Sequence, residues 1–140
     1  QGALGVGQMH LLPKFLSERA AQAERYQMGL NGVEGLVTPS VPAQTTHAFQ
    51  AYVCRLTFGD STHREHLMKV LASKGVQTRP GTHAVHRLHW HRTHLTFDAQ
   101  TLKNSDVAHD QTIALPISPG MSEVEQLYVI DTLKLALKEL

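Results

Sequence analysis

The sequence has one cysteine, no long hydrophobic run and almost no net charge. A single cysteine, Cys54, excludes an intrachain disulfide and favours a reducing compartment, so we expect a cytoplasmic protein. No stretch approaches the roughly 18 consecutive apolar residues of a membrane-spanning helix. The 13 basic and 12 acidic residues give a net charge of +1, which provides no electrostatic basis for binding nucleic acid. We therefore expect neither a membrane nor a nucleic acid as partner.

Hydrophobic residues make up 41% of the 140 residues, enough for one core with a flanking arm. The chain begins with glutamine rather than methionine and enters a helical pattern at once. We interpret it as a fragment or an isolated domain of a longer protein.

The first thirty residues carry apolar side chains at spacings of three, four and seven, the period of a one-sided helix. The positions that form this stripe are Met9, Leu12, Leu16, Ala23, Tyr26 and Leu30. Pro13 should kink the segment or start a second helix, and Asn31-Gly32 should end it. Residues 1–32 are thus predicted to form a long helical arm.

Residues 33–140 show short strand patterns between helical patterns, which predicts a small α/β (α+β) domain. Its sheet should have two to four strands, with helices packed on it. The predicted strands lie near Leu36–Val37, over 46–56 and at 76–78. Helices are predicted from the Asp60-Ser61-Thr62 cap to about Lys74 and over 102–115, with loop and some helix over 83–94. A last helix follows the Ser122/Glu125 capping box and carries on one face Leu127, Ile130, Leu133, Leu137 and Leu140.

Five histidines between positions 83 and 94 could bind a metal ion, since neutral imidazole is a good ligand for zinc, copper or nickel. They are His83, His86, His89, His91 and His94. No acidic residue lies between His83 and Phe97, and Cys54 has no cysteine partner. We assign no metal ligand, and a histidine-rich metal-binding or scaffolding module without catalysis remains the alternative. Cys54 lies in a predicted strand, where an inert buried thiol is expected.

The segment Arg79-Pro80-Gly81-Thr82-His83 places an arginine and a histidine on a turn directly after a predicted strand. Such a turn is suited to anion recognition, although a solvated turn is the plainer interpretation.

Several segments together resemble the DegT/DnrJ/EryC1/StrS aminotransferases, a family of sugar aminotransferases of PLP fold type I. The segments are Gln1-Gly2-Ala3-Leu4-Gly5-Val6-Gly7-Gln8-Met9 with Arg19 and Tyr26 after it, residues 47–55 (HAFQAYVCR), residues 75–80 (GVQTRP), His86, and residues 114–122 (ALPISPGMS). Their order and spacing carry the resemblance more than any single one of them, and together they extend over essentially the whole chain.

The resemblance implies that the chain is the C-terminal small domain of such an enzyme, which closes one side of the active site, and that a large domain is missing. The full-length enzyme would be a homodimer that uses pyridoxal 5'-phosphate (PLP), a nucleotide-linked keto-sugar and glutamate as amino donor. The lysine that forms a Schiff base with PLP would lie in the large domain. Because the six lysines present (Lys14, Lys69, Lys74, Lys103, Lys134 and Lys138) show no family motif, we expect them to be solvated, and the chain alone to be inactive and to bind no PLP.

The resemblance also places Arg79, His83 and His86 at the lip that faces the sugar substrate. An arginine could pair with a phosphate or carboxylate, and histidines could bind sugar hydroxyls. The sequence departs from the family at Thr82–Val85, where a Tyr-Pro pair is common. A fragment should also expose its former domain interface, and we expect Met9, Leu12 and Leu16 to lie there.

Overall fold

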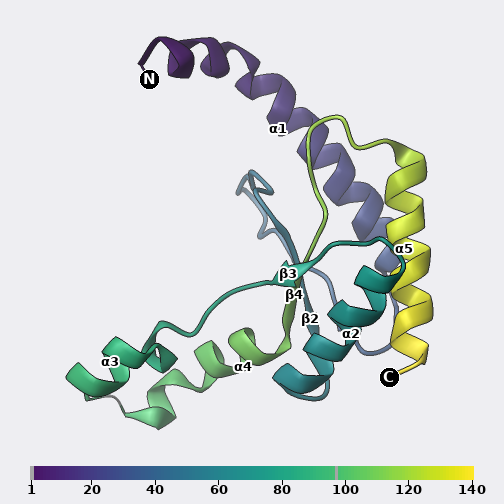
Figure 1. Cartoon of the computed structure of the whole chain (residues 1–140). Helices are drawn as coiled ribbons and strands as arrows, with labels where there is room; N and C mark the ends of the chain where they lie inside the picture. The colour runs from purple at the N-terminus through teal and green to yellow at the C-terminus, as the bar shows by residue number, and fades with distance from the viewer. Residues whose placement is uncertain (1, 97) are drawn as a thin grey trace.

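The computed structural model describes residues 2–96 and 98–140. A four-stranded sheet lies at the centre, helices pack against it, and a smaller helical lobe extends away from it (Figure 1). The elements are α1 (Gly2–Leu30), β1 (Leu36–Val37), β2 (Tyr52–Leu56), α2 (Ser61–Ser73), β3 (Arg79–Pro80), the 3-10 helix η1 (Val85–Arg87), α3 (His89–His94), the 3-10 helix η2 (Ala99–Leu102), α4 (Lys103–Gln111), β4 (Thr112–Leu115) and α5 (Glu123–Lys138). This confirms the predicted fold class of a small sheet with packed helices and a long helical arm.

The sheet has the order β1-β2-β4-β3, and all three pairings are antiparallel. Its central strand β4 is buried at every position, while β2 alternates between buried and half-buried residues. The buried side of β2, which includes Tyr52 and Cys54, contributes to the core together with residues of α1, α2 and α5. The rings of Tyr26 and Tyr52 lie 4.8 Å apart between centroids, so the arm helix packs directly on the sheet.

Local signals placed several elements correctly. The short strand at Leu36–Val37 is present, and Asp60 caps α2 by accepting hydrogen bonds from the backbone N–H groups of Thr62 and His63. The Ser122/Glu125 capping box is also present at the start of α5. These signals depend on neighbouring residues only, which is why the sequence reveals them.

The helix predicted over 102–115 is wrong at its C-terminal end. Helix α4 stops at Gln111, and the next four residues form β4. The run Thr-Ile-Ala-Leu does not alternate between apolar and polar residues, because it is buried on both sides at the centre of the sheet. A short apolar run of this kind fits a helix or a strand equally well.

Two predicted strands are displaced. The strand expected at 76–78 lies at Arg79–Pro80, where the chain pairs with Ala114 and Ile113 of β4. Proline is accepted there because β3 is an edge strand and needs no N–H on its outer side. The strand expected over 46–56 starts only at Tyr52, since Phe49 has a positive φ of 44° that interrupts the extended backbone.

The terminal helix buries a different stripe from the one predicted. Ile130 and Leu133 are buried as expected, but Leu127 is 55% exposed, and Gln126 and Val129 take its place in the core. The spacing of apolar residues shows that a helix has a buried face, but it does not fix which of two neighbouring residues lies at the centre of that face. Packing against α1 and α2 decides this for α5.

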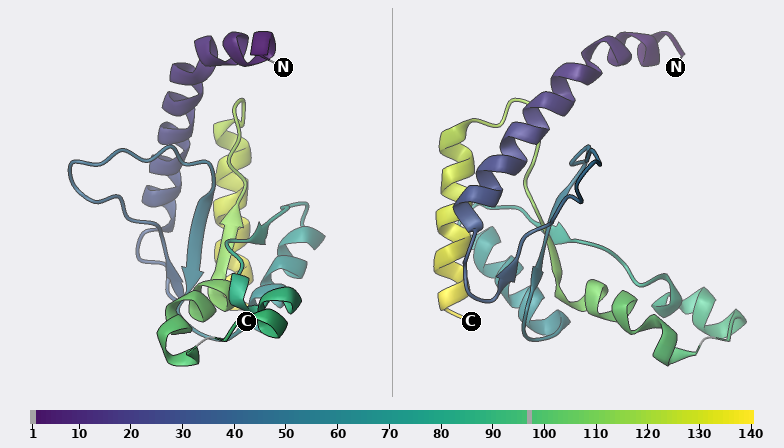
Figure 2. Two further views of the ribbon diagram at one scale, coloured as in Figure 1. Left: turned by 90° about the vertical axis from the view of Figure 1, so that its left-hand side faces the viewer. Right: turned by 180° about the vertical axis from the view of Figure 1, so that it is seen from behind.

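Helix α1 is one continuous helix with Pro13 inside it, and its ribbon bends in the N-terminal part (Figure 2). Its C-terminal half belongs to the core, whereas Met9, Leu12 and Leu16 are 63%, 39% and 40% exposed. The predicted exposure of these three side chains is confirmed. Within the described ranges, no helix has the length and apolar character needed to cross a bilayer.

Candidate functional site

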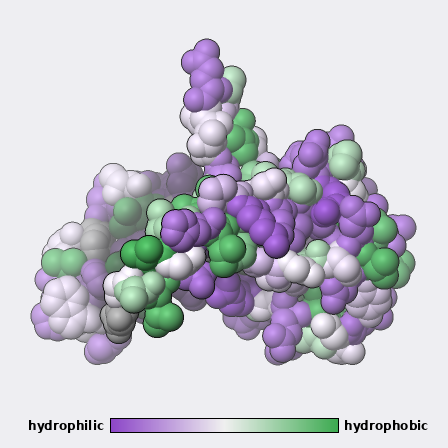
Figure 3. Space-filling model, turned by 90° about the horizontal axis from the view of Figure 1, so that it is seen from above, coloured by the Kyte–Doolittle hydropathy of each residue, from purple (hydrophilic) through white to green (hydrophobic). Residues whose placement is uncertain are grey.

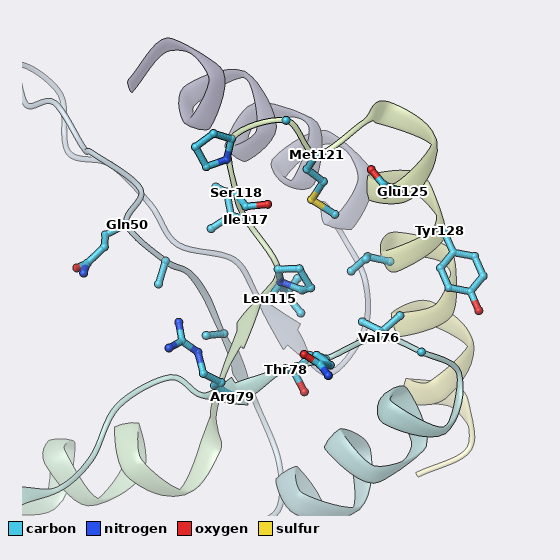
Figure 4. A pocket seen from close by; sticks show the side chains of 18 of the residues that line it. Gln50, Val76, Thr78, Arg79, Leu115, Ile117, Ser118, Met121, Glu125 and Tyr128 are labelled. Atoms are coloured by element: carbon cyan, nitrogen blue, oxygen red, sulfur yellow. The ribbon is translucent and has the colours of Figure 1, made fainter. Parts of the chain in front are cut away.

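A pocket opens beside the sheet, between the β3 edge and the N-terminal half of α5. We call it the main pocket; its volume is about 860 Å³. It is lined by residues 50–51, 75–79 and 114–121 and by Val124, Glu125, Tyr128 and Val129 of α5 (Figure 4). The floor is mostly apolar, and the polar groups lie around it, an arrangement typical of ligand sites.

The loop over 116–121 forms one wall of the main pocket, and helix α1 holds it in place. Tyr26 Oη donates a 2.6 Å hydrogen bond to the carbonyl of Pro116. The side chain of Gln22 pairs with Ser118 in both directions: Nε2 donates to the carbonyl at 2.8 Å, and Oε1 accepts from the N–H at 3.2 Å. Burial raises the pKa of Tyr26, so its hydroxyl remains a donor at any physiological pH. The arm helix therefore shapes the pocket as well as packing on the sheet.

Arg79 is the cation of the main pocket. It lies on the edge strand β3, its side chain is exposed, and its guanidinium extends toward the side of the pocket where Gln50 lies (Figure 4). Its side chain makes no hydrogen bond or ion pair with another residue of the described chain. Beside it, Thr78 Oγ1 is buried and has no hydrogen-bond partner among these residues. A cation and an unused hydroxyl at one edge can receive an anionic, hydrogen-bonding ligand.

Glu125 is the only carboxylate in the described lining of the main pocket, and it is already hydrogen-bonded to Ser122. Its Oε2 accepts hydrogen bonds from the N–H and the hydroxyl of Ser122 at 2.8 and 2.7 Å. These bonds hold the pKa of Glu125 below its usual range. Glu125 thus completes a helix cap, and Arg79 has no counter-ion inside the pocket.

His83 and His86, the other two predicted site residues, lie outside the lining of the main pocket. His83 is exposed, and its ring centroid is 5.9 Å from that of His109. His86 is half-buried in η1, with Nε2 2.8 Å from Asp106 Oδ1. The structure thus brings one of the three predicted residues into the pocket and leaves the two histidines on the segment that leads from β3 into the lobe.

Ion pairs hold together the lobe formed by η1, α3, η2 and α4. Arg87 donates to Asp106 at 2.5 Å and, through two nitrogens, to Asp110 at 2.7 and 2.9 Å. These contacts raise the pKa of Arg87 and lower that of Asp110. Burial alone would raise the pKa of Asp106, but hydrogen bonds from Arg87 and His86 outweigh it and hold that pKa low. Both carboxylates therefore remain ionised well below neutral pH.

The histidine-rich segment forms η1 and the short helix α3, in agreement with the prediction of loop with some helix. The ring of Trp90 stacks on that of His94 at 4.7 Å. Over residues 2–96 and 98–140, no three side chains of histidine, cysteine, aspartate or glutamate are grouped so that they could hold a metal ion. The metal-binding alternative therefore has no ligand set in this part of the chain.

No lysine lines the main pocket among the described residues. Lys69 lines a smaller pocket of about 530 Å³ on the other side of Arg79, and Lys134 and Lys138 line a third one near the C-terminus of α5. Cys54 is fully buried, as expected from the sequence, and burial raises its pKa to about 12, which disfavours the reactive thiolate.

Sequence reasoning missed Gln50, Thr78 and the loop over 116–121 as pocket residues. The Pro-x-x-Pro-Gly pattern of that loop, directly before a helix cap, marks a fixed connection between β4 and α5 and could have indicated it.

Hydrophobic regions on the outside are separate from one another and interspersed with hydrophilic residues in the view from above (Figure 3).

Comparison with known proteins gives consistent matches. A statistical model of the DegT/DnrJ/EryC1/StrS aminotransferase family matches residues 1–134. GDP-perosamine synthase from Caulobacter vibrioides is 30% identical over 126 residues, which are 89% of this chain and 33% of that protein. A dTDP-4-dehydro-2,6-dideoxy-D-glucose 3-dehydratase from Saccharopolyspora spinosa is 25% identical, over 95% of this chain and 29% of its own.

The crystal structure of the aminotransferase TlmJ from Streptoalloteichus hindustanus superposes with a TM-score of 0.85 and 27% identity, over 96% of this chain and 35% of that one. The chain thus spans about one third of the length of the proteins it matches.

Proposed function

Because the chain belongs to the DegT/DnrJ/EryC1/StrS aminotransferase family, we propose that it forms the C-terminal small domain of a PLP-dependent enzyme that transfers an amino group to a nucleotide-linked keto-sugar. The main pocket carries this proposal: it offers a cation, polar groups and an apolar floor, but no amine in its described lining. A surface of this kind can bind and enclose a substrate, whereas the covalent step needs groups from elsewhere.

The residues described here do not fit the whole cofactor. A PLP site needs a lysine that holds the cofactor covalently, an acidic partner for the pyridine nitrogen and a cup of donors for the phosphate. The main pocket has no lysine, and its only described carboxylate caps α5. We therefore assign PLP, which supplies the electron sink for amino-group transfer, to the remaining two thirds of the enzyme, and expect this chain alone to bind none.

In this proposal Arg79 pairs with a phosphate or carboxylate of the substrate, because it is a cation without a counter-ion at the mouth of the pocket. His83 and His86 contact sugar hydroxyls from the neighbouring lobe. The name of the Caulobacter relative, a GDP-perosamine synthase, supports a nucleotide sugar as substrate. Glutamate as amino donor, a homodimer and a cytoplasmic location complete the proposal.

The exposed side chains of Met9, Leu12 and Leu16 support a missing large domain. They form an apolar stripe on a part of α1 that extends from the body (Figure 1), and an isolated helix of this length is marginal in water. We assign the stripe to the contact between this chain and the large domain.

Binding of a nucleotide sugar to the ¹⁵N-labelled chain tests the proposal directly. With GDP-mannose as probe, NMR shift changes should cluster at residues 50–51, 77–79 and 116–121, with further changes at His83 and His86. Arg79→Ala should remove most of the changes in the pocket, whereas Arg92→Ala, an exposed arginine outside the main pocket, should not. No shift changes at millimolar probe, or changes confined to other surfaces, would reject a substrate-facing role.

A titration with PLP tests the assignment of the cofactor. The chain should show no stoichiometric absorbance band of a lysine-bound cofactor, and borohydride treatment should label no single lysine. A one-to-one band that disappears with one lysine substitution would overturn the assignment.

Dehydration of the same class of sugar is the second candidate, favoured by the name of the Saccharopolyspora relative. The two reactions separate in the full-length enzyme: transamination needs a stoichiometric amino donor such as glutamate and yields an amino sugar, whereas dehydration yields no amino sugar.

A further inference from the structure

His109 lies near the C-terminal end of α4, beside the segment that leads from β3 into the lobe. Its Nδ1 accepts a 3.1 Å hydrogen bond from the backbone N–H of Ala84. Its carbonyl accepts a hydrogen bond from the buried side chain of Arg64 in α2. Ala84 is 1% exposed, so its N–H has no water to replace the imidazole. One histidine thus joins the incoming segment, the lobe and the body of the domain.

The bond from Ala84 fixes the protonation state of His109. An imidazole nitrogen accepts a hydrogen bond only when it carries no proton, so the ring must be neutral, with its proton on Nε2. A second proton on Nδ1 would place two donors face to face and leave a buried N–H without a partner. Protonation and the bond to Ala84 therefore exclude each other.

The charges around His109 also oppose protonation. The cations Arg64 of α2 and Arg87 of η1, and the ring of His83 in the incoming segment, face it, while Asp106 and Asp110 of α4 are already paired with Arg87. Burial, Arg87, Arg64 and His83 all lower the pKa of His109, and only Asp110 raises it. Protonation of this ring is thus costly in the closed arrangement and becomes easier once the segment leaves.

Few other contacts can retain residues 82–84 when that bond is lost. The helices η1, α3 and α4 contain no buried residue, so the lobe has no apolar core of its own. Within η1, His86 Nε2 lies 2.8 Å from Asp106 Oδ1, and the ion pairs of Arg87 with Asp106 and Asp110 also hold η1 on α4. On the other side, the N–H of Gly81 donates to the carbonyl of Thr112 at 2.9 Å. Residues 82–84, which carry His83, lie between these two anchors and depend on the bond to His109.

We propose that His109 is an acid-sensitive latch: its neutral ring holds residues 82–84, which carry His83, on α4, and its protonation releases that stretch while η1 stays on α4. Because the closed state favours the neutral ring, the latch is fully engaged above the ordinary histidine pKa of about 6.5 and is lost as the pH falls below it. The latch does not depend on which substrate the main pocket binds.

Hydrogen–deuterium exchange of the whole chain tests the latch. Relative to its intrinsic exchange rate, the amide of Ala84, followed in peptides that cover residues 83–88, should lose protection by about fivefold or more between about pH 7.5 and pH 5, as expected for one lost buried hydrogen bond. Peptides from β4 and α5 should keep theirs. Equal protection of residues 83–88 at both pH values would overturn the proposal.

Two substitutions identify the titrating group. His109→Asn places an amide oxygen where Nδ1 stands, so it keeps an acceptor that cannot titrate and should abolish the pH dependence. The matched control His66→Asn, an exposed histidine of α2, should leave it unchanged. If the dependence persists in His109→Asn and disappears in His86→Asn, the latch is His86, and the assignment to His109 is wrong.

A measurement on the unsubstituted chain covers the case in which His109→Asn fails to fold. The ¹⁵N shifts of the His109 ring at about pH 7.5 should show a proton on Nε2 and none on Nδ1. A proton on Nδ1 at that pH would remove the acceptor and refute the latch.

Discussion

The pairing of Gln22 with Ser118 gives the sharpest stability prediction. Gln22 lies in α1 and is 3% exposed, yet it is bonded in both directions to the backbone of a loop 96 residues away. Gln126 Nε2 in turn donates to the carbonyl of Gln22 at 2.5 Å. The side chain of Gln22 thus ties the arm helix to the pocket loop, and its backbone carbonyl ties the arm helix to α5. Gln22→Ala removes both bonds to Ser118 at once.

The expected loss is about 2 kcal/mol, since each neutral hydrogen bond contributes about 1 kcal/mol net. We do not add a full desolvation penalty, because Ser118 is exposed and water can replace the amide. In a domain of this size the loss corresponds to a fall in Tm of roughly 5–10 °C. Urea unfolding followed by far-UV circular dichroism measures it. Gln22→Glu keeps the acceptor but turns a carboxylate toward the Ser118 carbonyl, so it should destabilise at least as much at neutral pH.

Gln8→Ala is the matched control, because Gln8 lies in the same helix but is exposed. It should change the free energy of unfolding by no more than about 0.5 kcal/mol. If Gln22→Ala also stays within about 0.5 kcal/mol of the unsubstituted chain, α1 does not hold the pocket wall through Gln22, and the reasoning fails.

Two further predictions concern the sheet. Gly81→Ala should destabilise the chain by about 1–3 kcal/mol, because a Cβ there would lie 2.5 Å from Val53 Cγ1 and from Thr112 Oγ1, both in packed strands. The control Gly7→Ala, with open space around it, should be neutral or slightly stabilising in the same urea unfolding assay. Equal effects of the two substitutions would contradict the packing argument. Cys54 should not react with Ellman's reagent in the folded state at about pH 8, because burial raises its pKa to about 12, and it should react fully in urea; fast reaction of the folded chain would show that β2 opens.

The sequence by itself determined the features that depend on neighbouring residues. The cap at Asp60, the Ser122/Glu125 capping box, the short strand at Leu36–Val37 and the buried position of Cys54 follow from local chemistry, and the structure has all of them. The order of the family-like segments was equally available, because it needs no contact between distant residues. The resemblance placed Arg79 at the substrate-facing lip, and the structure puts it in the lining of the main pocket; the local pattern alone left a solvated turn as the plainer interpretation.

Only the tertiary structure decided which residues lie opposite one another. The run Thr112–Leu115 became the central strand because β2 and β3 flank it, which no local pattern states. The wall of the main pocket depends on Gln22 and Tyr26, which lie 90 or more residues away from the loop they hold. His83 and His86 lie outside the pocket, on a segment held against α4 by the bond of Ala84 to His109, by the contact of His86 with Asp106 and by the ion pairs of Arg87. Such pairings arise when the chain folds back on itself, and the spacing of residues along one segment does not contain them.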